Sequence, residues 1–431
     1  MEQPIVMLSL FLIFFILLLL GAPISIALGA AGTFFLIKNS LGFEILTPNF
    51  YGGIAKFPLL AVPFFILAGN IFREVGIAER IVRLVRLLTG SMYGGFAVAV
   101  VMVGAFWGAV SGSGPATAAA LGVIFIPEMV KAGYPAGFSS ALVASSAGLS
   151  IIIPPSVALI LYGSITTDSI STLFIAGFIP GIITAFFIAA GAWIYSRYYG
   201  YRSESKFLWK DVLESTIYAA WGLIAPIVIL GGIYGGIFSP TEAAVIGVFY
   251  GLFVGLFIYR SLDIKKIYNV LLESAITSAV VMIIVGFASV FTYVGLVMGV
   301  MEASAKFILS ISDNPYIVLF LVMFIVFIAG MLIDPVSIYY VFVPMFLPII
   351  IHFKWNSIWF GILFTVNIAI AQISPPLALN LYVVAPIAGI RIEEVFKSSY
   401  LFVLMVALAL FVLSLYPEFA LILPKILGYV K

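Results

Sequence analysis

Two pairs of adjacent prolines interrupt segments that are otherwise long and apolar enough to cross a membrane. Pro154 and Pro155 lie within residues 138–164, and a second pair, Pro375-Pro376, lies within residues 357–389. Proline has no N–H group to donate and its ring clashes with the preceding helical turn, so neither segment forms one continuous helix. The freed backbone carbonyls are tolerated at membrane depth only where protein, water or an ion satisfies them. Two such breaks in matching positions of two halves indicate the binding site of a transporter.

The composition predicts a membrane protein. Of the 431 residues, 64% are hydrophobic and 9% are charged, whereas soluble globular proteins have about 25% charged residues. The apolar runs match the roughly 20 residues that span a bilayer as a helix. A membrane barrel strand would instead show about 10 residues in which apolar and polar side chains alternate. We therefore predict an all-α polytopic membrane protein.

Residue counts argue against several function classes. A net charge of +2 with scattered basic residues argues against nucleic-acid binding. The chain has no cysteine and one histidine, His352, so disulfides, iron–sulfur clusters and cysteine–histidine zinc sites are excluded and no cofactor is expected. The sequence contains no Gly-x-x-x-x-Gly-Lys-Ser/Thr motif, so transport is not driven by a P-loop of this chain. The first apolar run follows a start that is not basic, which favours a retained span over a signal peptide.

Ten apolar segments are predicted to cross the membrane, and two more are predicted to enter and leave it on one side. The two exceptions are residues 92–130, interrupted at residues 111–115, and residues 316–351, interrupted at Asp334-Pro335. A return limb over residues 118–130 would form about 20 Å of helix, short of the roughly 30 Å hydrocarbon core. We expect re-entrant helical hairpins, with a full extra pair of spans in each place as the alternative. The ten crossings lie near residues 5–20, 22–37, 57–72, 138–164, 172–196, 217–237, 241–259, 274–299, 357–389 and 399–416.

The basic residues agree with this topology. With the N-terminus outside, the outer face holds only six of the 20 basic residues and the inner face holds the rest. This asymmetry obeys the positive-inside rule, but it does not separate hairpins from full spans. The six outer residues are Lys38, Lys56, Lys306, Lys354, Lys425 and Lys431.

The two halves of the chain, residues 1–210 and 211–431, are predicted to be inverted repeats. Each half has three spans, a hairpin, a span broken at Pro-Pro and one more span. Pro155 and Pro376 are 221 residues apart, which is close to the 222 residues between Gly112 and Asp334. Because each half contains five crossings, an odd number, the second half enters the membrane upside down relative to the first, as in many secondary transporters.

Two further patterns concern packing. Residues 78–88 place Arg80, Arg83 and Arg86 on one helical face, which predicts an amphipathic helix in the inner interface that joins a fixed part to a moving part. A short extension of the third span is the alternative. A glycine every fourth residue from Gly247 to Gly255 predicts close helix packing, either within the chain or against another subunit.

The first hairpin tip and the first helix break offer oxygen ligands for a dehydrated cation. Ser111 and Ser113 lie at the tip, and Ser150, Ile153 and Pro155 border the break with hydroxyl and carbonyl oxygens. Glycines beside the two tip serines permit a tight turn and a close approach of backbone to ligand. Close packing of small residues is the alternative, but it does not account for the Pro-Pro break.

The second half offers a related site that includes a carboxylate. Asp334 at the tip is the only acidic residue flanked on both sides by long apolar runs, and Gln372, Ser374 and either Pro376 or Leu377 lie at the break. A carboxylate within a membrane indicates a functional site, with a cation or a proton as partner. Asp334 also suits the N-cap of a helix that begins at Pro335, and the two roles are compatible.

Three polar residues, Thr117, Ser156 and Asn380, are predicted to line the substrate cavity, although each could instead satisfy a neighbouring backbone group. No lysine, arginine or histidine falls inside the proposed core. The charge of an anionic substrate would therefore be met by the N-termini of half-helices and by bound cations.

Five motifs, in order and at family-like spacing, carry a resemblance that covers essentially the whole chain. The chain resembles the large membrane subunit of the tripartite ATP-independent periplasmic (TRAP) transporters, a branch of the ion transporter superfamily. The motifs are Val110-Ser-Gly-Ser-Gly-Pro-Ala-Thr117, Ile153-Pro-Pro-Ser156, Gly236-Ile-Phe-Ser-Pro-Thr-Glu-Ala-Ala244, Gly330-Met-Leu-Ile-Asp-Pro335 and Ser374-Pro-Pro376.

The resemblance implies a sodium-driven elevator transporter, in which a transport domain of hairpins and broken helices moves against a scaffold. It implies import of an organic acid, such as sialic acid or a C4-dicarboxylate, across a bacterial or archaeal cytoplasmic membrane. The partners that it implies are a small four-helix membrane subunit, expected as a separate chain, and a periplasmic substrate-binding protein. The family's sodium positions fall on the first-site residues and on Asp334, Gln372 and Ser374.

Two alternatives remain open at the level of sequence. A stand-alone sodium-dependent anion symporter of the same superfamily would need no binding protein. A membrane enzyme or a channel belongs to another class, and the lack of a histidine, cysteine or paired-carboxylate constellation at membrane depth argues against the enzyme.

Overall fold

The described residues, 2–90, 92–202 and 209–430 of the computed structural model, form helices and no β-strand apart from one isolated bridge between Tyr93 and Arg202. The predicted all-α class is confirmed. The first half contains α1 (Glu2–Leu19), α2 (Ile24–Lys38), α3 (Leu46–Ile54), α4 (Ala61–Glu74), α5 (Ile77–Thr89), α6 (Gly95–Ser111), α7 (Gly114–Lys131), α8 (Ala136–Ala147), α9 (Val157–Thr166) and α10 (Ile170–Tyr198). The second half contains α11 (Trp209–Tyr234), α12 (Pro240–Phe253), α13 (Ile264–Val297), α14 (Val300–Leu309), α15 (Pro315–Gly330), α16 (Pro335–His352), α17 (Ser357–Ala371), α18 (Leu379–Ala388), α19 (Ile392–Leu415) and α20 (Glu418–Ile426).

Seven helices within the described residues are long and apolar enough to cross a membrane. They are α4 with the turn before it (Phe57–Glu74), α10, α11, α12 with the π-turn after it (Pro240–Ile258), α13, α16 and α19. The other predicted crossings contain shorter helices, such as the 15 residues of α2, or are the two broken segments. The chain is a multi-pass membrane protein, and the count of ten crossings stays a prediction.

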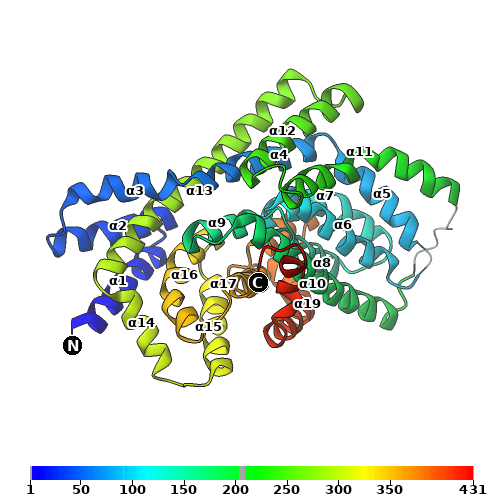
Figure 1. Cartoon of the computed structure of the whole chain (residues 1–431). Helices are drawn as coiled ribbons and strands as arrows, with labels where there is room; N and C mark the ends of the chain where they lie inside the picture. The colour runs from blue at the N-terminus through cyan, green and yellow to red at the C-terminus, as the bar shows by residue number, and fades with distance from the viewer. Residues whose placement is uncertain (1, 91, 203–208, 431) are drawn as a thin grey trace.

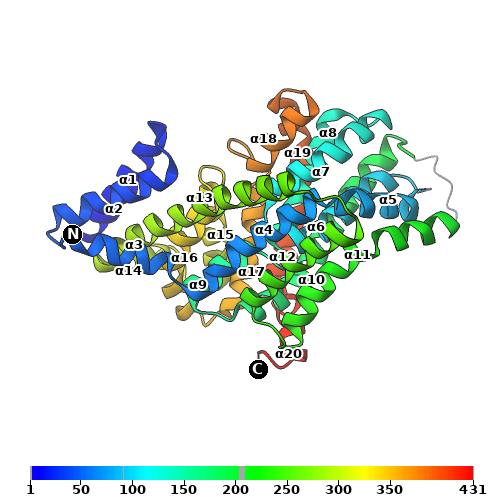
Figure 2. The same ribbon diagram turned by 90° about the horizontal axis from the view of Figure 1, so that it is seen from above.

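The packing between helices pairs the two halves of the chain. α2 packs on α13, and α12 packs on α4; in the same way α7 packs on α18, and α16 packs on α9. By their order in the two halves, α2 is equivalent to α12, α4 to α13, α7 to α16 and α9 to α18. Each of these contacts therefore has a counterpart between the equivalent helices, as expected for a twofold relation between the halves. α5 and α14, which occupy equivalent places, lie at opposite ends of the elongated molecule (Figure 1, Figure 2). The division at residue 210 stays a prediction, because residues 203–208 lie outside the described residues.

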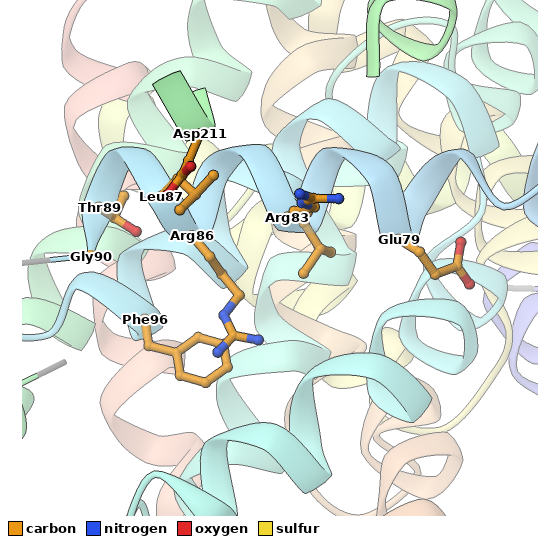
Figure 3. A pocket seen from close by; sticks show the side chains of 9 residues that line it. Glu79, Arg83, Arg86, Leu87, Thr89, Gly90, Phe96 and Asp211 are labelled. Carbon is orange, nitrogen blue, oxygen red and sulfur yellow. The ribbon is translucent and has the colours of Figure 1, made fainter. Parts of the chain in front are cut away.

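The arginine-bearing helix expected at residues 78–88 is α5, and its apolar face is covered by protein. Most of its apolar residues, among them Ile77 and Ile81, are buried, whereas Leu88 is exposed, and the helix packs on α6 and α11. On the polar side, the guanidinium carbon of Arg80 lies 3.7 Å from the centre of the Tyr259 ring. The guanidinium of Arg86 lies beside the ring of Phe96 (Figure 3), with 4.5 Å between the guanidinium carbon and the ring centre. Most of the apolar face therefore packs against neighbouring helices of this chain.

The glycines of α12 also pack within the chain. A Cβ atom added at Gly251 would lie 2.7 Å from the Ile71 side chain on α4, and one added at Gly247 would lie 3.2 Å from Ile229 on α11. The smooth face predicted from the glycine spacing is therefore used between helices of this chain.

Both predicted hairpins and both helix breaks are present. α6 and α7 meet at Gly112 and Ser113, where Gly112 has a φ of +65°, a left-handed conformation that glycine adopts without strain. After a 3-10 turn at Gly148–Ile151 the chain is non-helical up to α9, and between α17 and α18 it is non-helical as well. The Pro154-Pro155 and Pro375-Pro376 peptide bonds are both cis.

The return limb of the first hairpin is longer than predicted. The helix α7 begins at Gly114 and has 18 residues, or about 27 Å, where residues 118–130 alone would give about 20 Å. The reason is that Pro115 lies in the first turn, where its missing N–H group costs no helical hydrogen bond, so it starts the helix instead of delaying it. Limb length therefore does not distinguish a re-entrant hairpin from two spans.

Candidate functional site

One cavity brings both hairpin tips and both helix breaks together. It has a volume of about 300 Å³ and lies between these four segments and the helices α4 and α13. Four of the predicted cation ligands line it: Ser111, Ser113, Asp334 and Gln372. The remaining predicted residues lie around this cavity without lining it.

The first tip and the first break are in close contact. The Pro155 carbonyl oxygen would lie 3.1 Å from a Cβ atom at Gly112, and the Ser150 Cα atom would lie 2.9 Å from one at Gly108. Only glycine allows this approach without displacement, which explains why small residues occupy the end of α6. The structure therefore brings Ser111 at the tip close to Ser150 and Pro155.

Free oxygens remain at this contact. Within the described part of the chain, the carbonyls of Ile153 and Pro155 accept no hydrogen bond. The Ser150 hydroxyl donates to the Ala147 carbonyl at 2.7 Å, which leaves the lone pairs of its oxygen unused. The Ile153 side chain packs against Gly181 of α10, so only its backbone is placed to act as a ligand.

Asp334 both caps a helix and lines the cavity. One carboxylate oxygen accepts a hydrogen bond from the Ser337 backbone N–H at 3.1 Å, and the other accepts one from the Ser337 hydroxyl at 2.5 Å. The capping role considered from sequence is therefore present at the N-terminus of α16. Among the described residues, no lysine, arginine or histidine forms an ion pair with Asp334. No basic side chain in the described part of the chain is therefore placed to balance a negative charge on this carboxylate.

The residues at the second break are not gathered in one place. Gln372 lies against the first hairpin, since its side-chain oxygen would lie 2.5 Å from a Cβ atom at Gly114. The Ser374 hydroxyl donates to the Ile370 carbonyl at 2.8 Å, and Leu377 is exposed and does not line the cavity. Its backbone N–H donates to the Met331 carbonyl at 3.2 Å and so ties the second break to the second hairpin.

Asn380 links the two halves at the cavity. Its side-chain nitrogen lies 3.2 Å from the Gln372 side-chain oxygen and 3.2 Å from the Ala144 carbonyl on α8. Its side-chain oxygen would lie 2.9 Å from a Cβ atom at Gly114. Residues predicted for a second-half site thus contact first-half elements, and the polar groups of the two halves form one connected cluster.

Two of the three predicted substrate residues carry unpartnered oxygens. The side-chain oxygens of Thr117 and Asn380 are buried and have no hydrogen-bond partner among the described residues. A buried polar atom without a partner costs about 1–3 kcal/mol, so both are suited to a bound ligand or water. Ser156, in contrast, is the N-cap of α9: its hydroxyl oxygen accepts a hydrogen bond from the Leu159 N–H, and its O–H donates one to the Ile151 carbonyl. Its side chain already serves the local backbone.

Sequence reasoning missed the polar residues that α4 and α13 contribute. Asn70, Glu273 and Thr277 line the cavity, and Asn70 donates to the Ser274 hydroxyl at 2.9 Å. Glu273 forms an ion pair with Arg73 at 2.5 Å, which places a salt bridge between α4 and α13 at the cavity. Asn70 could have been found, because it is a polar residue inside the apolar segment 57–72.

The ligand atoms available at the cavity favour a hard cation. The site combines hydroxyl, amide and carbonyl oxygens with the carboxylate of Asp334, and a second carboxylate, that of Glu273, lines the cavity in an ion pair with Arg73. Within the described ranges, no three histidine, cysteine, aspartate or glutamate residues gather closely enough to hold a metal ion. Oxygen ligands suit alkali and alkaline-earth cations, whereas nitrogen and sulfur ligands select transition metals.

Comparisons with known proteins show similarity over almost the whole chain. Residues 11–419 match the family described as "Tripartite ATP-independent periplasmic transporter, DctM component". The chain is 33% identical over 427 residues to the C4-dicarboxylate TRAP transporter large permease protein of Rhodobacter capsulatus, covering 96% of this chain and 97% of the relative. It is 36% identical over 410 residues to the ectoine large permease protein of Halomonas elongata, covering 94% and 96% of the two chains.

A third relative is the sialic acid TRAP transporter large permease protein of Vibrio cholerae. It is 31% identical to this chain over 415 residues, which cover 96% of this chain and 97% of the relative. The fold is similar to the crystal structure of the Alcanivorax borkumensis YdaH transporter, with a TM-score of 0.65, 14% sequence identity and coverage of 90% of this chain and 88% of that one. At that identity the likeness extends to the fold alone. The chain belongs to the family of TRAP transporter large permease subunits.

Proposed function

We propose that this chain is the permease of a sodium-coupled secondary transporter, which imports an organic acid delivered by a periplasmic binding protein. The observation that carries the proposal is the single cavity at which two hairpin tips and two broken helices meet. Broken helices provide both free carbonyls for a cation and helix N-termini for an anion, as transporters of this architecture require.

Sodium coupling is supported by the oxygens at the first tip and break. Ser111 lines the cavity, and the free Ile153 and Pro155 carbonyls lie at the adjacent break. Asp334 adds a charged oxygen on the opposite tip. We propose sodium ions as co-transported ions held by these two sets of oxygens, with no further cofactor. The carboxylate makes the second set the stronger cation site.

An organic acid as substrate is supported by helix termini. α7 begins at Gly114, which lines the cavity, and its N-cap residue Ser113 makes no side-chain capping hydrogen bond. The N-terminus of a helix carries partial positive charge and favours a carboxylate. Thr117 and Asn380 supply buried polar oxygens nearby for the hydroxyl or amine groups of such a substrate. By analogy with the relatives, sialic acid and C4-dicarboxylates are the substrates that we propose to test first.

An elevator motion is supported by how the site divides between two groups of elements. The long helix α13 and α4 form one wall of the cavity, and the hairpins and broken helices form the other. Gly69 of α4 faces the first tip, since a Cβ atom there would lie 3.2 Å from the Ser111 Cα atom. We propose that the two inverted repeats, residues 1–210 and 211–431, each contribute a hairpin and a broken helix to the moving part. A smooth contact of this kind favours sliding.

We propose two protein partners: a small four-helix membrane subunit and a periplasmic substrate-binding protein. The proposed location is the bacterial or archaeal cytoplasmic membrane, and no enzymatic activity is proposed. The relatives are named large permease proteins of tripartite systems, which supports this assignment.

The test is uptake of labelled sialic acid and succinate into proteoliposomes under an inward sodium gradient. We expect uptake only when this chain, the small subunit and the binding protein are all present, and none when potassium replaces sodium. Sodium-driven uptake by this chain alone would support the stand-alone symporter instead. Currents far above the turnover of a carrier would indicate a channel and contradict both.

A further inference from the structure

A second, larger cavity lies on the side that the charge distribution assigns to the outer face. It has a volume of about 730 Å³ and is lined by α3, α13, α14, the end of α9 and α16. It shares no lining residue with the cavity at the hairpin tips. Its size falls within the roughly 300–1,000 Å³ of small-molecule pockets.

Lys56 is the basic side chain that lines this cavity. It follows α3, is half-buried, and its Nζ atom donates to the Ser164 carbonyl at 2.7 Å. Ser164 lies in the last turn of α9, where carbonyls lack helical partners and the helix carries partial negative charge. The ammonium group is thus fixed in position by the end of a broken helix.

The ammonium group keeps donors free for a ligand. A lysine ammonium has three N–H donors, and the Ser164 carbonyl uses one. In the described part of the chain, no carboxylate lies within ion-pair distance of Lys56. Glu302 lines the same cavity from α14, but it is exposed at the rim and does not pair with the lysine. The charge of Lys56 is therefore uncompensated.

Neutral hydrogen-bonding groups accompany this charge. Asn49, Thr292 and Tyr293 line the cavity, and the Thr292 hydroxyl donates to the Tyr340 carbonyl at 2.7 Å. Apolar side chains such as Leu347 supply the rest of the wall. A fixed cation beside neutral polar groups and apolar walls is the composition that selects a small organic anion.

We propose that this outer cavity is a binding subsite for the carboxylate of a small organic acid, held by Lys56. The proposal rests on the proposed function in one respect only: the substrate is taken to bind at this subsite before it reaches the cavity at the hairpin tips. The binding claim itself concerns this chain and needs no transport.

The absence of cysteine from the sequence gives a direct test. Gly52 lines the cavity and a Cβ atom added there meets no atom within 4 Å, so Gly52→Cys places a thiol in open space. The rate of its modification by an uncharged maleimide is measured on the purified full chain. Acetate, succinate and gluconate are the probes, and acetamide is the neutral control. Gly231→Cys on α11, which also has open space around the added Cβ atom, is the control position away from the cavity.

We expect at least one carboxylate to slow the labelling of Gly52→Cys in a saturable way, by about twofold when its concentration equals its Kd. Acetamide should not slow it, and Gly231→Cys should be unaffected by any probe. Lys56→Gln should abolish the protection and Lys56→Arg should retain it. The Lys56 substitutions are made in the Gly52→Cys protein, and their labelling rates without probe are compared with that of Gly52→Cys alone. If Lys56→Gln changes this rate, Lys56→Met is used in its place.

Protection by none of the three carboxylates, equal protection by acetamide, or protection that survives Lys56→Gln would each overturn the proposal. Because no sodium gradient, small subunit or binding protein is used, a failure of sodium-driven uptake leaves this result unaffected. A failure of protection equally leaves the proposed transport function untouched.

Discussion

Gly114→Ala tests whether the cluster of Gln372 and Asn380 is part of the site. The added methyl group would lie 2.5 Å from the Gln372 side-chain oxygen and 2.9 Å from the Asn380 side-chain oxygen. Both distances are below van der Waals contact, so one or both amides must move away from the tip of the first hairpin. Gly114 does not have a positive φ, so the substitution acts through the contact and not through backbone strain.

The expected magnitude follows from the cost of overpacking. Forcing an extra methyl group into a close-packed interior costs about 1–3 kcal/mol. If this cost falls on the ligand-bound state, the sodium or substrate concentration for half-maximal uptake rises by roughly 5- to 150-fold. The assay is the initial rate of uptake into proteoliposomes containing all three components, measured as sodium and substrate are varied separately.

Two alanine substitutions serve as controls for Gly114→Ala. Gly231→Ala on α11 adds a methyl group that meets no atom within 4 Å, and Gly148→Ala beside the first break makes only an ordinary contact of 3.5 Å with Ala369. Both should transport normally. If Gly114→Ala shows the same sodium and substrate dependence as these controls while folding normally, the reasoning about the cluster is refuted.

Three further substitutions separate binding from folding. Asp334→Asn keeps a good N-cap, so the protein should fold. Half-maximal uptake should need about tenfold more sodium, because a neutral oxygen binds a cation more weakly than a carboxylate does. Unchanged sodium activation would remove Asp334 from the site. Thr117→Val removes an oxygen that has no hydrogen-bond partner among the described residues, so the melting temperature in detergent should be kept or raised while uptake falls. Normal uptake would contradict the assignment of Thr117 to the substrate site. Ser156→Ala removes the N-cap of α9 and should cost about 1 kcal/mol of stability, seen as a lower melting temperature; a change in sodium dependence without one would show that Ser156 acts on the ions instead.

The local breaks of this fold could be predicted from sequence because proline and glycine act through the backbone itself. Pro154-Pro155 and Pro375-Pro376 end helices whatever surrounds them, and Gly112 permits the tight turn of the first hairpin. The same local chemistry paired each tip with the break of its own half in two separate sites, whereas one cavity in the structure is lined by both tips and both breaks. It did not predict the helices α3 and α14, which are short and carry no comparable signal.

The parts of the site that were missed depend on packing between distant segments. Gln372 was grouped with Asp334 because both belong to the second half, yet its side chain lies against Gly114 of the first hairpin. Glu273 and Thr277 belong to α13, and nothing in their spacing shows that this helix forms a wall of the cavity. Such contacts follow from the crossing of helices far apart in sequence, which periodicity does not encode.

Binding of radioactive sodium to the purified chain tests the central claim most directly. The hairpin tips and helix breaks are proposed to hold sodium through Ser111, Asp334 and the free carbonyls of the first break. The account predicts saturable sodium binding that potassium does not compete with, that is weakened by Ser111→Ala or Asp334→Asn alone, and that is lost when both are combined. Binding of the same affinity and amount in the combined variant, with its fold intact, would contradict it.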